Sequence, residues 1–94
     1  MKWYTRAAEQ KNLAAMSNLA FCRMHGIGCA QDREGAFALA LEAAKCGHAP
    51  AQTFVGECYL DGRGVEKDAA AGETWLYRAA RLGNARARML LETR

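Results

Sequence analysis

The sequence predicts an all-α fold, an α–α superhelix (solenoid) of antiparallel helix pairs in 36-residue repeats. Two observations lead to this prediction. Hydrophobic residues make up 51% of the 94-residue chain, alanine is the commonest residue and there is one proline, a composition that favours helix. The chain also aligns with itself at an offset of 36, so that residues 7–58 pair with 43–94 without a gap.

The residues that recur at this offset are ones with special structural roles. The matched pairs are Gly26 with Gly62, Gly28 with Gly64, Asp32 with Asp68, Gly47 with Gly83 and, at twice the offset, Trp3 with Trp75. Coincidences of glycine and tryptophan are rarer by chance than coincidences of alanine. We therefore interpret the pattern as a true internal repeat.

Each repeat is expected to hold two helices joined by a glycine turn. In the second copy the first helix is expected over about 49–60. The apolar residues that recur there at helical spacing are Ala51, Val55 and Cys58. Gly62 and Gly64 permit backbone angles that side chains disfavour, and Asp68 is placed to cap the next helix. Gly83 is placed to end that helix in a left-handed conformation.

The period divides the chain, taken as one domain over residues 1–94, into four parts. The expected parts are the second helix of an incomplete repeat (1–11), two repeats (12–47 and 48–83), and the first helix of another incomplete repeat (84–94).

The second copy resembles the Sel-1-like repeat, a relative of the tetratricopeptide repeat, over residues 47–68 and the helix that follows. The positions that match the pattern are Val55, Gly56, Tyr59, Gly62, Gly64, Val65, Asp68, Trp75, Ala79, Ala80 and Gly83. The first copy departs from it at Lys11, Ala20, Arg23, Cys29 and Leu39. The resemblance implies an α-solenoid that works as an adaptor or scaffold and is not an enzyme.

The resemblance also implies that the first helices of successive repeats line a concave face. Helical spacing then selects residues off the packing stripe. The expected partner-binding residues are Ser17, Phe21, Met24, His25, Thr53, Glu57, Leu60, Asp61, Arg86 and Met89. Phe21, Met24, Leu60 and Met89 would form an apolar strip flanked by charges, which suits a peptide or helix with hydrophobic anchors. Packing between repeats is the alternative role of Phe21 and Met24.

A zinc site is the first chemical alternative. Its ligands would be Cys22, His25, Cys29, Cys46 and His48. The first three of these and the last two would lie at opposite ends of the helix expected over 33–46, roughly 21 Å apart, which is too far for one metal ion. Because Cys22 and Cys29 match Cys58 and Val65 of the next repeat, we expect reduced, buried thiols instead. No metal, cofactor or catalytic residue is expected.

Two further functions stay open. Some cysteine-rich relatives of this repeat family are linked to β-lactam binding, which would imply a hydrolase-associated role. The second alternative is nucleic-acid binding through the basic C-terminal end. Net charge is +3, and the arginines of that end are Arg78, Arg81, Arg86, Arg88 and Arg94, against Glu92. A solvated helix face is the favoured explanation of these arginines, and a nucleic-acid partner is not expected.

The location and the oligomeric state are the last expectations. No apolar run approaches the ~20 residues of a membrane span, and the first residues lack the apolar stretch of a secretory signal. A cytoplasmic protein that does not contact a membrane is therefore expected from the chain as it stands. The terminal helices would present Trp3, Tyr4, Ala7, Met89, Leu90 and Leu91 without covering neighbours. Homo-oligomer formation through these ends is a further hypothesis.

Overall fold

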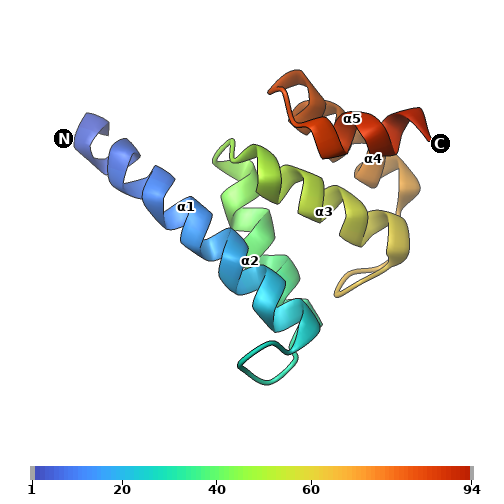
Figure 1. Cartoon of the computed structure of the whole chain (residues 1–94), viewed down its shortest axis with the longest axis horizontal. Coiled ribbons are helices and arrows are strands. Elements are labelled where there is room, and N and C mark those ends of the chain that lie inside the picture. Colours follow the sequence, from blue (N-terminus) through green and yellow to red (C-terminus); the bar gives the residue numbers. More distant parts are fainter. Residues whose placement is uncertain (1, 94) are drawn as a thin grey trace.

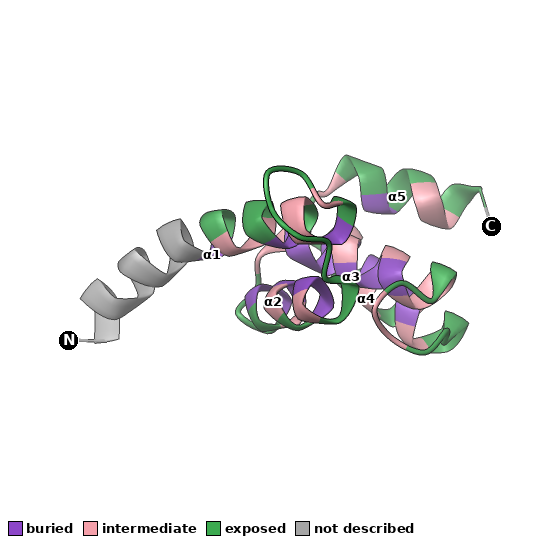
Figure 2. Ribbon diagram, turned by 90° about the horizontal axis from the view of Figure 1, so that it is seen from below, coloured by how far each residue is buried: buried purple, intermediate pink, exposed green. Residues whose placement is uncertain are grey.

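In the described part of the chain, five helices follow one another in a two-layer stack (Figure 1). The computed structural model describes the backbone of residues 2–93 and the side chains of residues 13–93. The helices are α1 (Lys2–His25), α2 (Arg33–Lys45), α3 (Ala49–Asp61), α4 (Ala69–Arg81) and α5 (Ala85–Glu92), and the described residues include no strand. Each helix packs on the next along the chain. In Figure 2, α2 and α4 lie along the lower side and α5 along the upper side, with buried residues between them. The predicted superhelix of helix pairs is confirmed.

The turn between the paired helices has the predicted conformation. Gly62 follows α3 with a φ of 73°, in the left-handed region, and its N–H donates to the Cys58 carbonyl at 2.7 Å. The Asp68 carboxylate then accepts from the Ala71 N–H at 3.1 Å, which satisfies one of the free amides at the start of α4. In the preceding repeat the Asp32 carboxylate caps α2 in the same way.

The N-terminal part differs from the prediction, because α1 is one continuous helix of 24 residues. A second helix over residues 1–11 and a separate first helix after it were expected. Gly47 and Gly83, each with a φ of 92°, follow α2 and α4 and let the chain turn there. Position 11 of the first copy is a lysine, for which a left-handed backbone is unfavourable. The helix therefore continues through this position to His25, and the expected turn after residue 11 is not formed.

Small residues let the helices approach closely. The buried residues between α1, α2 and α3 include Ala20, Ala36 and Ala40, together with Leu13, Phe37 and Met24. A second cluster, of Leu76, Ala79 and Ala87, joins α4 to α5. Since a close-packed interior has few voids, the small side chains at these positions set the distance between helix axes.

The two helix pairs use different residues at equivalent positions. Ala20, Ala36 and Ala40 of the α1–α2 pair become Gly56, Gly72 and Leu76 in the α3–α4 pair. A Cβ atom at Gly56 would lie 2.8 Å from the Leu76 Cγ, and one at Gly72 would lie 2.9 Å from the Gly56 carbonyl oxygen. Gly56 thus makes room for the leucine, which is fully buried, and Gly72 lets the backbones of α3 and α4 approach closely.

Candidate functional site

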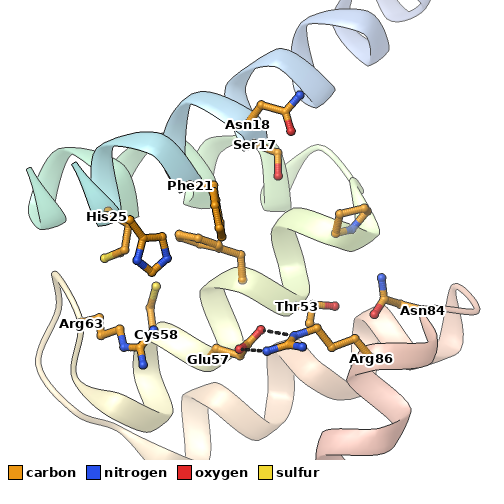
Figure 3. A pocket seen from close by; sticks show the side chains of 13 residues that line it. Ser17, Asn18, Phe21, His25, Thr53, Glu57, Cys58, Arg63, Asn84 and Arg86 are labelled. Carbon is orange, nitrogen blue, oxygen red and sulfur yellow. Dashed lines mark hydrogen bonds and ion pairs between the residues drawn. The ribbon is translucent and has the colours of Figure 1, made fainter. Parts of the chain in front are cut away.

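A groove of about 640 Å³ lies on the face formed by α1, α3 and the start of α5 (Figure 3). Its lining residues are Ser17, Asn18, Phe21, Met24 and His25 from α1; Pro50, Thr53, Phe54, Glu57 and Cys58 from α3; Arg63 from the following turn; and Asn84 and Arg86 at α5. All three helices that contribute are first helices of successive repeats, as the prediction of a concave face requires.

The α1 wall of the groove is aromatic. Ser17, Phe21 and His25 are four residues apart, which places them on one side of the helix. The Phe21 side chain is 50% exposed and points into the groove (Figure 3). Its ring centroid lies 4.5 Å from that of the His25 imidazole, and the two planes are tilted by 56°. The helix thus presents a phenylalanine surface that no other described part of the protein covers fully.

An ion pair crosses the opposite side of the groove. Arg86 of α5 donates from Nε and Nη2 to the two carboxylate oxygens of Glu57 on α3, each at 2.8 Å. These hydrogen bonds are the main reason that the pKa of Arg86 is raised. The fork geometry fixes both side chains, although an exposed pair of this kind contributes at most about 1 kcal/mol to stability. It occupies the Glu57 carboxylate, the one acidic side chain among the residues that line the groove.

The structure brings together seven of the ten residues predicted for the concave face. Those that line the groove are Ser17, Phe21, Met24, His25, Thr53, Glu57 and Arg86. Leu60, Asp61 and Met89 do not line it. Leu60 packs against the Leu76 cluster, Asp61 lies 3.3 Å from the Arg63 guanidinium, and Met89 is 61% exposed.

The predicted apolar strip is not formed, because Met24 and Leu60 pack inside the protein and Met89 lies outside the groove. Met24 is only 2% exposed and belongs to the core between α1 and α2, so packing, the alternative role, is the one the structure shows. Leu60 lies close to Gly72 of α4, on the side of α3 that faces its paired helix. Thr53 is buried as well, and its hydroxyl donates to the Ala49 carbonyl. Helical spacing separates these positions from the main packing stripe but does not tell which neighbouring helix they meet.

Several groove residues were missed by sequence reasoning. They are Asn18, Phe54, Cys58, Arg63 and Asn84. Arg63 stands between Gly62 and Gly64 in its turn. This position could have indicated a surface residue, because a turn of this kind holds its central side chain at the surface. Asn84 caps α5, with its side-chain oxygen accepting from the Ala87 N–H at 2.9 Å. A cap was foreseeable from the repeat, but its place beside the groove was not.

The four cysteines differ in burial, and Cys22, which was expected to be buried, is only partly so. Cys58 is buried, and burial is the largest cause that raises the pKa of its thiol to about 12. The thiol is therefore protonated at neutral pH and is a poor nucleophile. Cys29 and Cys46 are exposed, so the expectation that these thiols are buried is wrong for both. Cys29 lies in the loop after Gly28 and Cys46 at the end of α2, where no helix covers them.

Neither a metal cluster nor a membrane span is found in the described part of the chain. No group of three or more histidine, cysteine or acidic side chains there is arranged to hold a metal ion. Among the described helices, none combines the length and the apolar character that crossing a bilayer requires.

The stack of glycine-turned helix pairs defines an α-solenoid repeat protein, and comparisons with known proteins give its family. The family model of the Sel1 repeat matches residues 1–12, 13–48 and 49–84. The chain therefore belongs to the Sel1 repeat family. No curated protein sequence shows a significant match to it.

Two solved structures are similar over most of the chain. One is a Sel1 repeat protein from Oxalobacter formigenes, with a TM-score of 0.81 and 34% identity over 85% of this chain and 33% of that one. The other is a protective antigen of uropathogenic Escherichia coli strains that displays an SLR fold. Its TM-score is 0.75, with 37% identity over 89% of this chain and 18% of that one. The chain thus spans a third or less of the length of either structure.

Proposed function

We propose that this chain binds a segment of another protein in the groove between α1, α3 and α5, and that it acts as an adaptor or scaffold and not as an enzyme. The observation that carries the proposal is the half-exposed Phe21 ring in the wall of the groove. A soluble protein gains free energy by covering such a ring, and burial of a phenylalanine side chain is worth about 1.5–3 kcal/mol.

The chemistry of the groove suits a peptide. Phe21, Phe54 and Pro50 offer apolar surface for one or two anchoring side chains. The Asn18 amide offers donors and an acceptor for the backbone of a bound segment, and Asn84, whose oxygen caps α5, offers its NH₂ group as a donor. Membership of a helical-repeat family supports the same conclusion, because stacked repeats form extended concave surfaces of this kind.

A catalytic role is less well supported by the same residues. Nucleophilic catalysis needs a thiol or hydroxyl that is activated by a lowered pKa or by a neighbouring base. The Cys58 thiol has a raised pKa, and the Thr53 hydroxyl is buried with its proton donated to a backbone carbonyl. Both groups therefore support a binding surface over an acyl-transfer site.

Selection of a phage-displayed library of random peptides on the immobilised chain tests the proposal. We expect enriched sequences with an aromatic or aliphatic anchor, and loss of their binding in the Phe21→Ser variant. The matched control is Tyr77→Ser, which removes an equally exposed aromatic ring from α4, outside the groove. Failure to enrich any peptide, or equal loss in both variants, would contradict the proposal.

A further inference from the structure

A second, smaller hollow of about 250 Å³ adjoins the groove. Its lining residues are Met24, His25, Gln31, Arg33 and Arg63. Met24, His25 and Arg63 line both spaces, so the hollow is one end of the groove. Figure 3 shows His25 and Arg63 at the same end, away from the Glu57–Arg86 pair. A peptide that covers Phe21 is therefore within reach of this hollow.

A close contact between repeats brings the two arginines to this place. Gly64 lies so near the first residue of α2 that a Cβ atom built on it would overlap the Arg33 carbonyl group. The same atom would lie 3.2 Å from the Phe37 Cβ. The glycine turn of the second repeat thus rests directly on the start of α2, and this contact sets Arg63 beside Arg33. The equivalent glycine, Gly28, would meet nothing within 4 Å.

The hollow has more positive than negative charge. Its lining includes two guanidinium groups and one imidazole but no carboxylate. Arg63 has a partial partner in Asp61, at 3.3 Å, and both side chains are about half exposed. Within residues 13–93, the Arg33 side chain takes part in no hydrogen bond or ion pair. The one acidic residue that lines the groove, Glu57, is already held by Arg86.

We propose that the peptide bound in the groove carries acidic side chains at this end, next to the apolar anchor that covers Phe21. This inference rests on the proposed function and specifies the ligand. An arginine guanidinium donates two parallel hydrogen bonds to a carboxylate, and two such groups from adjacent repeats suit neighbouring aspartate or glutamate side chains. Such pairing fixes the direction in which the segment lies and increases its rate of association.

The arrangement favours a peptide over a nucleic acid. A single strand is bound by cations that follow its backbone along a groove. Here Arg33 and the partly paired Arg63 lie at one end, while Arg86 at the other side is paired with Glu57 and the remaining lining is apolar or neutral. One cationic end beside an apolar wall matches an acidic segment with a hydrophobic anchor.

The test uses synthetic fluorescein-labelled peptides that share the anchor found by phage selection and differ only in the flanking positions, which are glutamate, glutamine or lysine. Fluorescence anisotropy gives the affinity of each. We expect the glutamate peptide to bind about tenfold or more tightly than the glutamine peptide, with a difference that shrinks as salt is added. Arg33→Gln combined with Arg63→Gln should abolish the difference. Arg81→Gln combined with Arg88→Gln removes the same number of charges from exposed arginines that line neither hollow, and this control should preserve the difference.

The outcomes separate the two proposals. If the glutamine or lysine peptide binds as well as the glutamate peptide, and Phe21→Ser still removes binding, the proposal of an acidic ligand is wrong. The proposal that a peptide binds in the groove is then still supported. If Phe21→Ser leaves the affinity of every peptide unchanged, both proposals fail. Displacement of the glutamate peptide by single-stranded RNA, in the parent chain and not in the double arginine variant, would assign the hollow to phosphate groups and overturn the inference.

Discussion

His48 and Asn84 stand at the same position of successive repeats, just before α3 and α5. Their backbone angles are nearly equal, with φ and ψ of −79° and 107° for His48 and of −73° and 115° for Asn84. The Asn84 side chain caps its helix, whereas the His48 side chain makes no capping hydrogen bond. The N-terminal backbone of α3 has the conformation of a capped helix, but no side chain accepts a hydrogen bond from the N–H groups of its first turn.

We predict that His48→Asn raises the free energy of unfolding by about 0.5–1 kcal/mol, because asparagine supplies the missing acceptor for the Ala51 N–H. Chemical denaturation followed by circular dichroism measures the change. The reverse comparison is Asn84→Ala, which should lower the free energy of unfolding by about 1 kcal/mol. No gain from His48→Asn, with the expected loss from Asn84→Ala, would contradict the assignment of an empty cap.

The same variant should change the pH dependence of stability. Partial burial lowers the pKa of His48 from 6.5, so the folded state favours the neutral imidazole. Below about pH 6.5 the unfolded chain binds more protons at this residue than the folded chain does, and stability falls as the pH falls. Between about pH 7 and about pH 5.5 the loss should be smaller in His48→Asn than in the parent chain. An equal loss in both would show that His48 is not the group responsible.

At the level of helices, much of the fold could be predicted from sequence, because recurring glycines and aspartates mark the turns. Gly62, Asp68 and Gly83 bound α3 and α4 as expected. Helical periodicity alone carries less information. It placed Phe21 in the groove correctly, but it grouped Met24 with it, since a residue three positions further along the helix points towards the paired helix as much as towards the groove.

The α3–α4 contact shows how neighbouring positions depend on each other. Gly56→Ala alone should lower the free energy of unfolding, because its Cβ would lie 2.8 Å from the Leu76 Cγ. Leu76→Ala alone should lower it by about 2–5 kcal/mol, because it leaves a cavity. We predict that the double variant loses about 1 kcal/mol less than the sum of the two single losses. The reason is that it places two alanines at these positions, as Ala20 and Ala40 do in the preceding repeat.

Denaturant titrations of the parent, the two single variants and the double variant give the coupling energy. A useful second pair is Gly56→Ala with Asp32→Ala, because the Asp32 carboxylate caps α2 through the Gly35 N–H and does not contact Leu76. That pair should be additive. Additivity in the Gly56 and Leu76 pair as well would contradict the proposed exchange of size between the two faces.

At the level of the whole molecule, the stack is flat, with extents of 41 × 33 × 19 Å and a Cα radius of gyration of 13.1 Å. The α5 side has an uncovered face. Met89 is 61% exposed there, whereas its equivalent in the middle of the stack, Thr53, is 4% exposed. Leu90 and Leu91 are half-buried against the Leu76 cluster, so only part of the apolar surface expected at this end is open. The side chains of Trp3, Tyr4 and Ala7, expected at the other end, lie outside the described side chains.

We predict that the chain self-associates through the α5 face, and that Met89→Glu weakens the association about tenfold or more, because a charge replaces exposed apolar surface. Light scattering over a concentration series measures the mass. The control is Ile27→Glu, which changes a similarly exposed residue in the loop after α1. A monomer at every concentration, or equal effects of the two substitutions, would contradict the prediction.

The exchange of Ala20, Ala36 and Ala40 for Gly56, Gly72 and Leu76 also bears on how the chain avoids misfolding. Repeats with the same turns and caps have the opportunity to pair with the wrong copy while the chain is still collapsing. The Leu76 side chain fits against a glycine, and against Ala20 it would meet a methyl group where the native partner has none. Mispairing of α4 with α1 is therefore disfavoured by sterics, and the order of helices along the stack is protected by one large residue, Leu76, and one absent side chain, that of Gly56.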